Sequence, residues 1–287
     1  MSQVSMILAF LIQVGPNPAA NDNLGVPDEL LNRPPRQSSL EAAQNPTTAW
    51  LEECLDLLAQ DPARAHSKAQ IRLTETSGAD RIIANHCLGL AATELGLWDD
   101  ARTAFIAARD ETPMDEQRTK ARFGLMAGNA ALGAGDQDDA LLLLQTAQEN
   151  AKTAASATLE ALAAMDVARV LVALGRPHDA FVPLSRATLL EPEKAEPWLL
   201  TATLYRRLER LDDAQEAIEQ AARLAPLEGA IGLEAGLIAV LSGRDEAARQ
   251  SWQSVIDTQP ESPAAKTAED YLEQLGPAPE TGQTSNP

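Results

Sequence analysis

The stretch from Ala195 to Pro226 reads AEPWLLTATLYRRLERLDDAQEAIEQAARLAP, and it decides the fold. Counting back from its last residue, apolar residues stand at set places: Trp198, Tyr205, Ala214, Ile218 and Ala221. Pro192, Pro226 and Pro260 are spaced 34 residues apart, and residues of the same types recur between them. A fixed period of this size is typical of a chain built from one stacked supersecondary unit.

Each unit has an alanine that opens its second helix, and a turn signal precedes it. The alanines are Ala101, Ala140, Ala180, Ala214 and Ala248. Glycine stands five residues earlier in four units (Gly96, Gly135, Gly175, Gly243), and Glu209 takes that place in the remaining one. We expect this residue to end the first helix in the left-handed conformation. Aspartates follow at Asp99–Asp100, Asp138–Asp139, Asp179, Asp212–Asp213 and Asp245. We expect them to cap the second helix and to complement its dipole.

Small residues recur in each first helix where two helices must approach closely. They include Gly89, Gly128 and Gly236. Large residues stand at one fixed place in the second helices, namely Phe105, Leu144, Leu184, Ile218 and Trp252. This small-against-large pattern at a period of 3.6 predicts paired, closely packed helices.

These residues resemble the tetratricopeptide repeat family, whose 34-residue pattern places Trp, Leu-Gly, Tyr, Ala, Phe, Ala and Pro at fixed offsets. The unit over Ala195–Glu228 departs from it at Thr201–Ala202, where the family prefers Leu-Gly. The resemblance implies an all-α fold, an α-solenoid of helix–turn–helix repeats wound as a right-handed superhelix. We expect five clear units over residues 82–262, a degenerate one over 46–79, and a helix near Ala264–Leu275 that caps the stack.

Composition restricts the function classes. Hydrophobic residues make up 45% of the 287 residues and aromatic residues only 3%, so the core must consist mainly of Ala and Leu. The formal net charge is −19, and such a surface repels phosphate backbones, which argues against nucleic-acid binding. It disfavours anionic membrane surfaces for the same reason.

The two ends differ from the repeats. Val4 to Val14 is an apolar run that is too short to span a bilayer, so no transmembrane segment is expected. Its length suits a secretory signal, so residues 1–20 are interpreted as a signal peptide or an apolar segment. Residues 21–45 are predicted to be a Pro-rich linker, residues 46–275 the repeat domain, and residues 276–287 a disordered tail. We therefore expect a bacterial protein exported to the periplasm. The alternative is a cytoplasmic protein that folds the apolar run into its own groove.

The chain offers little that resembles catalytic chemistry. Cys54 and Cys87 fall in predicted helices and are interpreted either as buried thiols or as a bridge between neighbouring helices. The three histidines fall in different units, so no metal site is expected. Because the sequence has no Gly-x-x-x-x-Gly-Lys loop and no Gly-x-Ser-x-Gly elbow, we expect no catalytic residues, no cofactor and no enzyme.

The resemblance also implies that certain first-helix positions line a concave groove. The residues of this chain at such positions that we select as a peptide-binding groove are Arg122, Leu125, Asn129, Met165, Arg169, Leu199, Thr203, Arg206 and Arg207. Arg presents a rigid fork to carboxylates, so the basic members are predicted to hold an acidic residue or the C-terminal carboxylate of an extended peptide. The alternative is that these arginines pair with the many Asp and Glu side chains of the surface.

The sequence therefore predicts a non-enzymatic scaffold or adaptor that binds a peptide or a partner helix. The alternative is a regulatory or assembly subunit that docks onto a catalytic partner in the cell envelope. The sequence identifies neither the protein partner nor the oligomeric state.

Overall fold

The computed structural model describes residues 46–277. The chain divides into two units, residues 1–49 and 50–287. The predicted signal segment 1–20, the linker 21–45 and the tail from 278 onward lie outside the described residues. The helices are α3 (Pro46–Gln60), α4 (Pro62–Glu75), α5 (Ala79–Glu94), α6 (Trp98–Glu111), α7 (Gln117–Gly133), α8 (Gln137–Thr153), α9 (Ala157–Ala173), η1 (Pro177–Ala180), α10 (Phe181–Leu190), α11 (Ala195–Arg207), α12 (Leu211–Leu224), α13 (Gly229–Leu241), α14 (Asp245–Thr258) and α15 (Pro263–Leu275).

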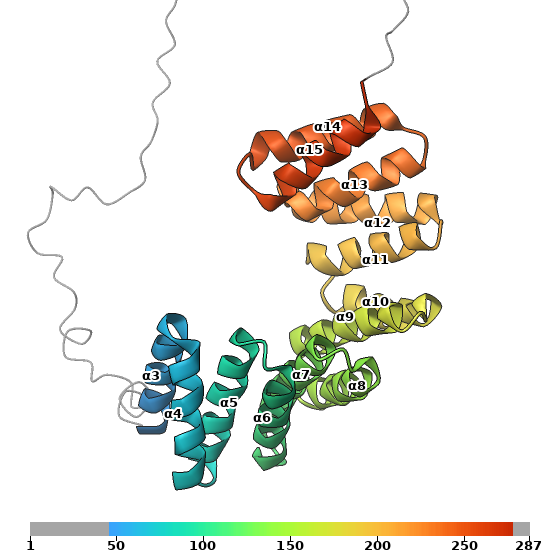
Figure 1. Cartoon of the computed structure of the whole chain (residues 1–287). Coiled ribbons are helices and arrows are strands. Elements are labelled where there is room, and N and C mark those ends of the chain that lie inside the picture. Colours follow the sequence, from blue (N-terminus) through green and yellow to red (C-terminus); the bar gives the residue numbers. More distant parts are fainter. Residues whose placement is uncertain (1–45, 278–287) are drawn as a thin grey trace, which may run out of the picture. The chain divides into compact units, whose positions relative to one another are not determined.

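Helices alone make up the regular structure of residues 46–277, as Figure 1 shows. From α4 onward each helix packs on the next one in the chain, and alternate helices such as α7 and α9, or α11 and α13, also touch. This nearest-neighbour packing is that of an α-solenoid, so the all-α solenoid predicted from the period is confirmed. The helix predicted near Ala264–Leu275 is α15, which packs on α13 and α14.

The turn inside each of the five helix pairs from α5–α6 to α13–α14 has the predicted left-handed residue. Gly96 has φ 70°, and the equivalent glycines 135, 175 and 243 have φ between 71° and 82°. Glu209, which replaces glycine in the α11–α12 turn, keeps the same conformation with φ 58°. A side chain in this region is strained, so the fold imposes the turn even where the sequence does not favour it.

The prediction that the aspartates after the turn cap the second helices is wrong. The N-cap residues of α6, α12 and α14 are Leu97, Arg210 and Arg244, and none makes a side-chain cap hydrogen bond. The aspartates lie one or more residues later, within the first turn, where a negative charge still complements the helix dipole. In α8 a different residue, Asp136, is the cap and accepts from the backbone N–H of Asp139 at 3.2 Å.

The small-against-large pattern corresponds to direct contact between the two helices of a pair. A Cβ atom added to Gly89 on α5 would stand 2.5 Å from Cε1 of Phe105 on α6. A Cβ atom on Gly128 would meet Cγ of Leu144 at the same distance, and one on Gly236 would collide with the Trp252 indole. All three large side chains are at most 3% exposed, so they have no free space into which to move.

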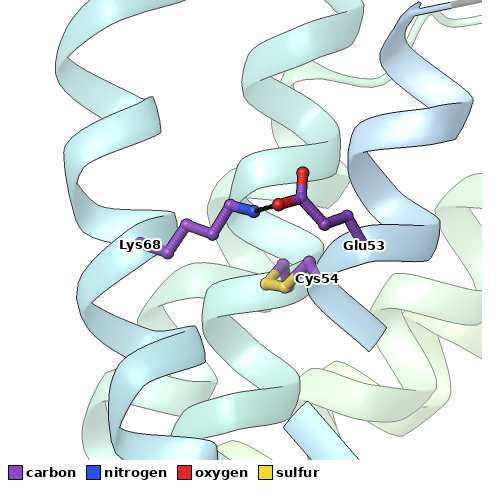
Figure 2. Close-up of a disulfide and its surroundings, with 4 residues drawn as sticks. Glu53, Cys54 and Lys68 are labelled. Carbon is purple, nitrogen blue, oxygen red and sulfur yellow. Dashed lines mark ion pairs between the residues drawn. A yellow bond between two sulfur atoms is a disulfide. The ribbon is translucent and has the colours of Figure 1, made fainter. Parts of the chain in front are cut away.

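A disulfide joins Cys54 on α3 to Cys87 on α5, with Cα atoms 6.4 Å apart. Figure 2 shows it beside the ion pair between Lys68 of α4 and Glu53 of α3, which measures 2.6 Å. Both cysteines are fully buried, together with the small residues Ala65, Ala69 and Ala91. Of the two interpretations of these cysteines, the structure has the bridge. It fastens the first helix of the array onto the third.

Candidate functional site: two adjoining pockets on the first helices

Two pockets open side by side on α9 and α11. The smaller, called here the α9–α11 pocket, has a volume of about 210 Å³. Its lining residues are Met165, Ala168, Arg169, Val172, Leu184, Leu200, Thr203, Leu204 and Arg207. Four residues of the predicted groove therefore meet here: Met165, Arg169, Thr203 and Arg207. An apolar floor with a hydroxyl and guanidinium groups at its edge suits an apolar side chain next to a carboxylate.

The larger pocket, called the three-helix pocket, is lined from α9, α11, α13 and the loops before α11 and α13, and has a volume of about 500 Å³. Its wall consists of Ala161, Leu162, Met165, Ala195, Pro197, Leu199, Ala225, Ala230 and Ile231. Its rim consists of Thr158, Glu191, Lys194, Glu196 and Glu228. Met165 contributes to both pockets and is 4% exposed, so one flexible side chain forms the partition between them.

Arg169 is held by carboxylates of the chain itself. Its Nη1 lies 2.6 Å from Oδ1 of Asp166 and its Nη2 lies 2.6 Å from Oε1 of Glu196. Asp166 also accepts from Nδ2 of Asn129 on α7 at 3.1 Å. This network links α7, α9 and α11, and it offsets the positive charge of Arg169 in the predicted groove.

Arg206 is likewise engaged within the fold. It forms a two-point pair with Glu234 on α13, a residue that is only 7% exposed. Its guanidinium lies outside the linings of both pockets. The alternative considered from the sequence, pairing with the chain's own carboxylates, therefore describes both Arg169 and Arg206.

The remaining members of the predicted groove separate into two groups. Leu125 is in the core of α7, 8% exposed, and Leu199 lines the three-helix pocket. Arg122 and Arg207 are exposed, and neither has an ion-pair partner among the described residues. Of these two, Arg207 lines the α9–α11 pocket. It is thus the guanidinium in the α9–α11 pocket that is available to a partner.

Sequence reasoning did not identify the particular carboxylates that pair with Arg169 and Arg206. Asp166 stands three residues before Arg169 on one helix, a spacing that brings the two side chains together and was visible in the sequence. Glu234 lies 28 residues after Arg206, and only the packing of α13 on α11 brings it close. No periodic signal pointed to it.

His86 lies on α5 and packs edge-on against Phe123 of α7, with ring centroids 5.3 Å apart. Burial lowers the pKa of its imidazole below the usual value. No group of three or more His, Cys, Asp or Glu residues within 46–277 has a geometry that could hold a metal ion. No helix of that same range is long and apolar enough to cross a bilayer.

The family model described as tetratricopeptide repeat matches residues 199–263. The structure is similar to that of PilW, described as a widely conserved type IV pilus biogenesis factor, with a TM-score of 0.60 and 16% identity over 78% of this chain and 98% of that chain. It is also similar to pilF of Pseudomonas aeruginosa, with a TM-score of 0.58 and 14% identity over 79% of this chain and 97% of that chain.

A third similar structure is MamA, from residue 41 to its end, of Desulfovibrio magneticus RS-1. Its TM-score is 0.53 and its identity 16%, over 65% of this chain and 99% of that chain. No curated protein sequence matches the chain. Likeness at these identities shows the fold alone, an α-solenoid built like those of tetratricopeptide-repeat structures. The resemblance drawn from the 34-residue period is therefore confirmed.

Proposed function

We propose that this protein is a non-enzymatic interaction scaffold that holds an extended segment of a partner protein across α9 and α11. The observation that carries the proposal is the α9–α11 pocket, where an apolar floor adjoins the exposed guanidinium of Arg207. A partner side chain in the pocket buries apolar area, and a carboxylate beside it pairs with Arg207 and accepts from the Thr203 hydroxyl. The partner group is therefore an acidic residue or a chain terminus next to an apolar residue.

A photo-cross-linking experiment tests this proposal. A benzoylphenylalanine placed at Thr203 in the full chain should give a partner adduct in the source cells. The same probe at Gln253, which is exposed on α14, should give none. Arg207→Glu should remove the Thr203 adduct by charge repulsion. The matched reversal Arg223→Glu, at an exposed position in the last turn of α12, should leave it unchanged. An adduct that survives Arg207→Glu while folding is intact contradicts the proposal.

An exported location forms part of the proposal. The buried Cys54–Cys87 bridge supports it, because structural disulfides persist in oxidising compartments and are rare in the cytosol. The test is alkylation of unfolded protein from freshly quenched cells with a polyethylene-glycol maleimide. We expect no mass shift before reduction and two added groups after it. Two groups added without reductant would indicate a cytoplasmic protein with free thiols.

A further inference from the structure

The spacing of the two pockets sets a register for the partner. On α9 the three-helix pocket is lined by residues within 158–165, and the α9–α11 pocket by residues within 165–172. The second run is the first shifted by seven residues, and an α-helix rises 1.5 Å per residue, so the pocket centres lie roughly 10 Å apart along α9. Two apolar side chains of one partner segment can therefore enter both pockets only if they are separated by this distance.

The distance selects a backbone conformation. A polyproline II segment has three residues per turn and rises about 3.1 Å per residue, so side chains at i and i+3 share a face roughly 9 Å apart. In a β-strand, side chains of one face are spaced by about 7 or 13 Å, and neither spacing matches the distance between the two pockets. A helix also presents i and i+7 at about 10 Å, and it is the alternative occupant that the peptide experiment below separates. The Arg169–Glu196 pair also joins α9 to α11 between the two pockets.

The rim of the three-helix pocket determines which charge is favoured on the partner residue next to the side chain that enters this pocket. Glu191 accepts from the Thr158 hydroxyl at 2.5 Å, and Glu228 is exposed, and neither has a cationic partner among the described residues. Glu196 is neutralised by Arg169, and Lys194 is the cation among the lining residues. Two carboxylates without a cationic partner, against one ammonium group, favour a basic residue, and the net charge of −19 attracts one from a distance.

We propose that the groove recognises a polyproline II-like segment with two apolar side chains at i and i+3. One of them enters the α9–α11 pocket next to a carboxylate, and the other enters the three-helix pocket next to a Lys or Arg. This inference rests on the proposed function and extends it by a second anchor and a defined charge order. The segment carries its basic residue towards Glu228 and its acidic group towards Arg207.

Fluorescence anisotropy with labelled synthetic peptides tests the register on the full chain. The matched peptide has the core Lys-Leu-Pro-Pro-Leu-Asp. The comparison peptides have one residue or six alanines between the leucines, or alanine in place of the first leucine. Loss of one buried apolar anchor should weaken binding by about tenfold or more. Equal binding of the single-leucine peptide overturns the inference, as does tighter binding of the six-alanine peptide, which would indicate a docked helix.

Substitutions in the protein test whether the second apolar side chain of the peptide enters the three-helix pocket. Ala230 is exposed and lines the three-helix pocket, so Ala230→Trp should fill it and weaken the matched peptide to the level of the single-leucine peptide, whose own affinity should not change. Ala63→Trp, at an exposed position on α4, is the matched control. Glu228→Lys should weaken the matched peptide and raise the affinity of a version with Glu in place of Lys, whereas Glu216→Lys on α12 should do neither.

The outcomes separate this inference from the proposed function. If the peptides bind and respond to Arg207→Glu but not to Ala230→Trp, the second anchor is wrong and the scaffold proposal stands. If none of the peptides binds, the register is overturned, and the cross-linking at Thr203 decides the proposed function independently.

Discussion

Arg206 and Glu234 join α11 to α13 by two parallel hydrogen bonds, with Nε 2.6 Å from Oε1 and Nη2 3.2 Å from Oε2. The carboxylate is almost completely buried, and the guanidinium side chain is 20% exposed. A planar fork against a planar carboxylate fixes the relative placement of the two helices as well as neutralising the charge. The pair therefore links two successive repeats.

Removal of the arginine should destabilise the array. Arg206→Ala leaves a carboxylate buried without its partner, and breaking a buried pair in this way costs about 3–5 kcal/mol. We expect the lower end of that range, and Arg206→Lys should not restore stability because an ammonium group makes a single-point contact. Urea unfolding followed by circular dichroism measures the effect. Arg207→Ala, one residue away and exposed, should shift the midpoint little. An Arg206→Ala protein with the parental midpoint would show that the pair has no structural role.

The close approach of Gly89 to Phe105 predicts that alanine at position 89 is tolerated only when residue 105 is smaller than phenylalanine. Gly89→Ala gains about 1 kcal/mol in helix propensity but places a methyl group against a ring that has no room to move, at a cost of about 1–3 kcal/mol. We therefore expect a net loss of stability. The double variant Gly89→Ala, Phe105→Leu should recover part of it, because two later units combine alanine with a residue of leucine size, Ala168 with Leu184 and Ala202 with Ile218.

Thermal melting of the two single variants and the double variant gives the coupling between the sites. Gly78→Ala is not a suitable control, since Gly78 has φ 60°. Phe105→Leu alone serves instead, and it should lose stability through the cavity it leaves. Simple additivity of the two single effects would mean that the helices tolerate the methyl group by moving apart.

Loss of the disulfide should loosen one end of the array only. The bridge closes a loop of 33 residues, which corresponds to about 3–4 kcal/mol of chain entropy in the unfolded state. In a stack of nearest-neighbour contacts this loss is local. Cys54→Ser with Cys87→Ser should therefore speed amide hydrogen exchange in α3 and α4 and leave α9 and α11 unchanged. Faster exchange along the whole array would show that the first pair supports all the others.

Acid should weaken the array through His86. Burial lowers the pKa of this imidazole in the folded chain, so below about pH 6.5 the unfolded chain binds a proton that the folded chain does not. Stability from this group is complete above the unfolded pKa and falls as the pH decreases through that range, by at most about 1.4 kcal/mol per pH unit. His86→Phe keeps a ring against Phe123 and removes this term. The variant should show a shallower loss of stability between pH 7 and 5.5, and identical slopes would contradict the assignment.

The fold was largely readable from the sequence because its signals are periodic. Ala101, Ala140, Ala180, Ala214 and Ala248 are all fully buried, as their fixed place in the unit implies. The left-handed turn was predicted from four glycines, and Glu209 follows them although its side chain opposes that conformation. The cap assignment failed because the composition does not distinguish an Asp at the cap from one in the first turn, and both complement the dipole.

The candidate site was readable only in part. Met165, Arg169, Thr203 and Arg207 stand at repeat positions on one helix face, and they meet around the α9–α11 pocket. The carboxylate with which each arginine pairs does not follow the repeat. Arg206 turns to Glu234 and Arg169 to Asp166 and Glu196, and these choices depend on the distance between neighbouring helices. The rim of the three-helix pocket comes mostly from inter-helix loops and helix starts, which the groove positions of the repeat do not include.

The paired sizes of the first-helix and second-helix residues restrict how this chain can change over evolutionary time. A glycine faces Phe105, Leu144 and Trp252, while alanine occupies the same place opposite Leu184 and Ile218. Each unit therefore pairs Gly or Ala on its first helix with a larger apolar residue on its second helix. A single step at either position passes through a less stable intermediate, so the two positions should drift together, and units should be exchanged between arrays as whole cassettes and not as separate helices.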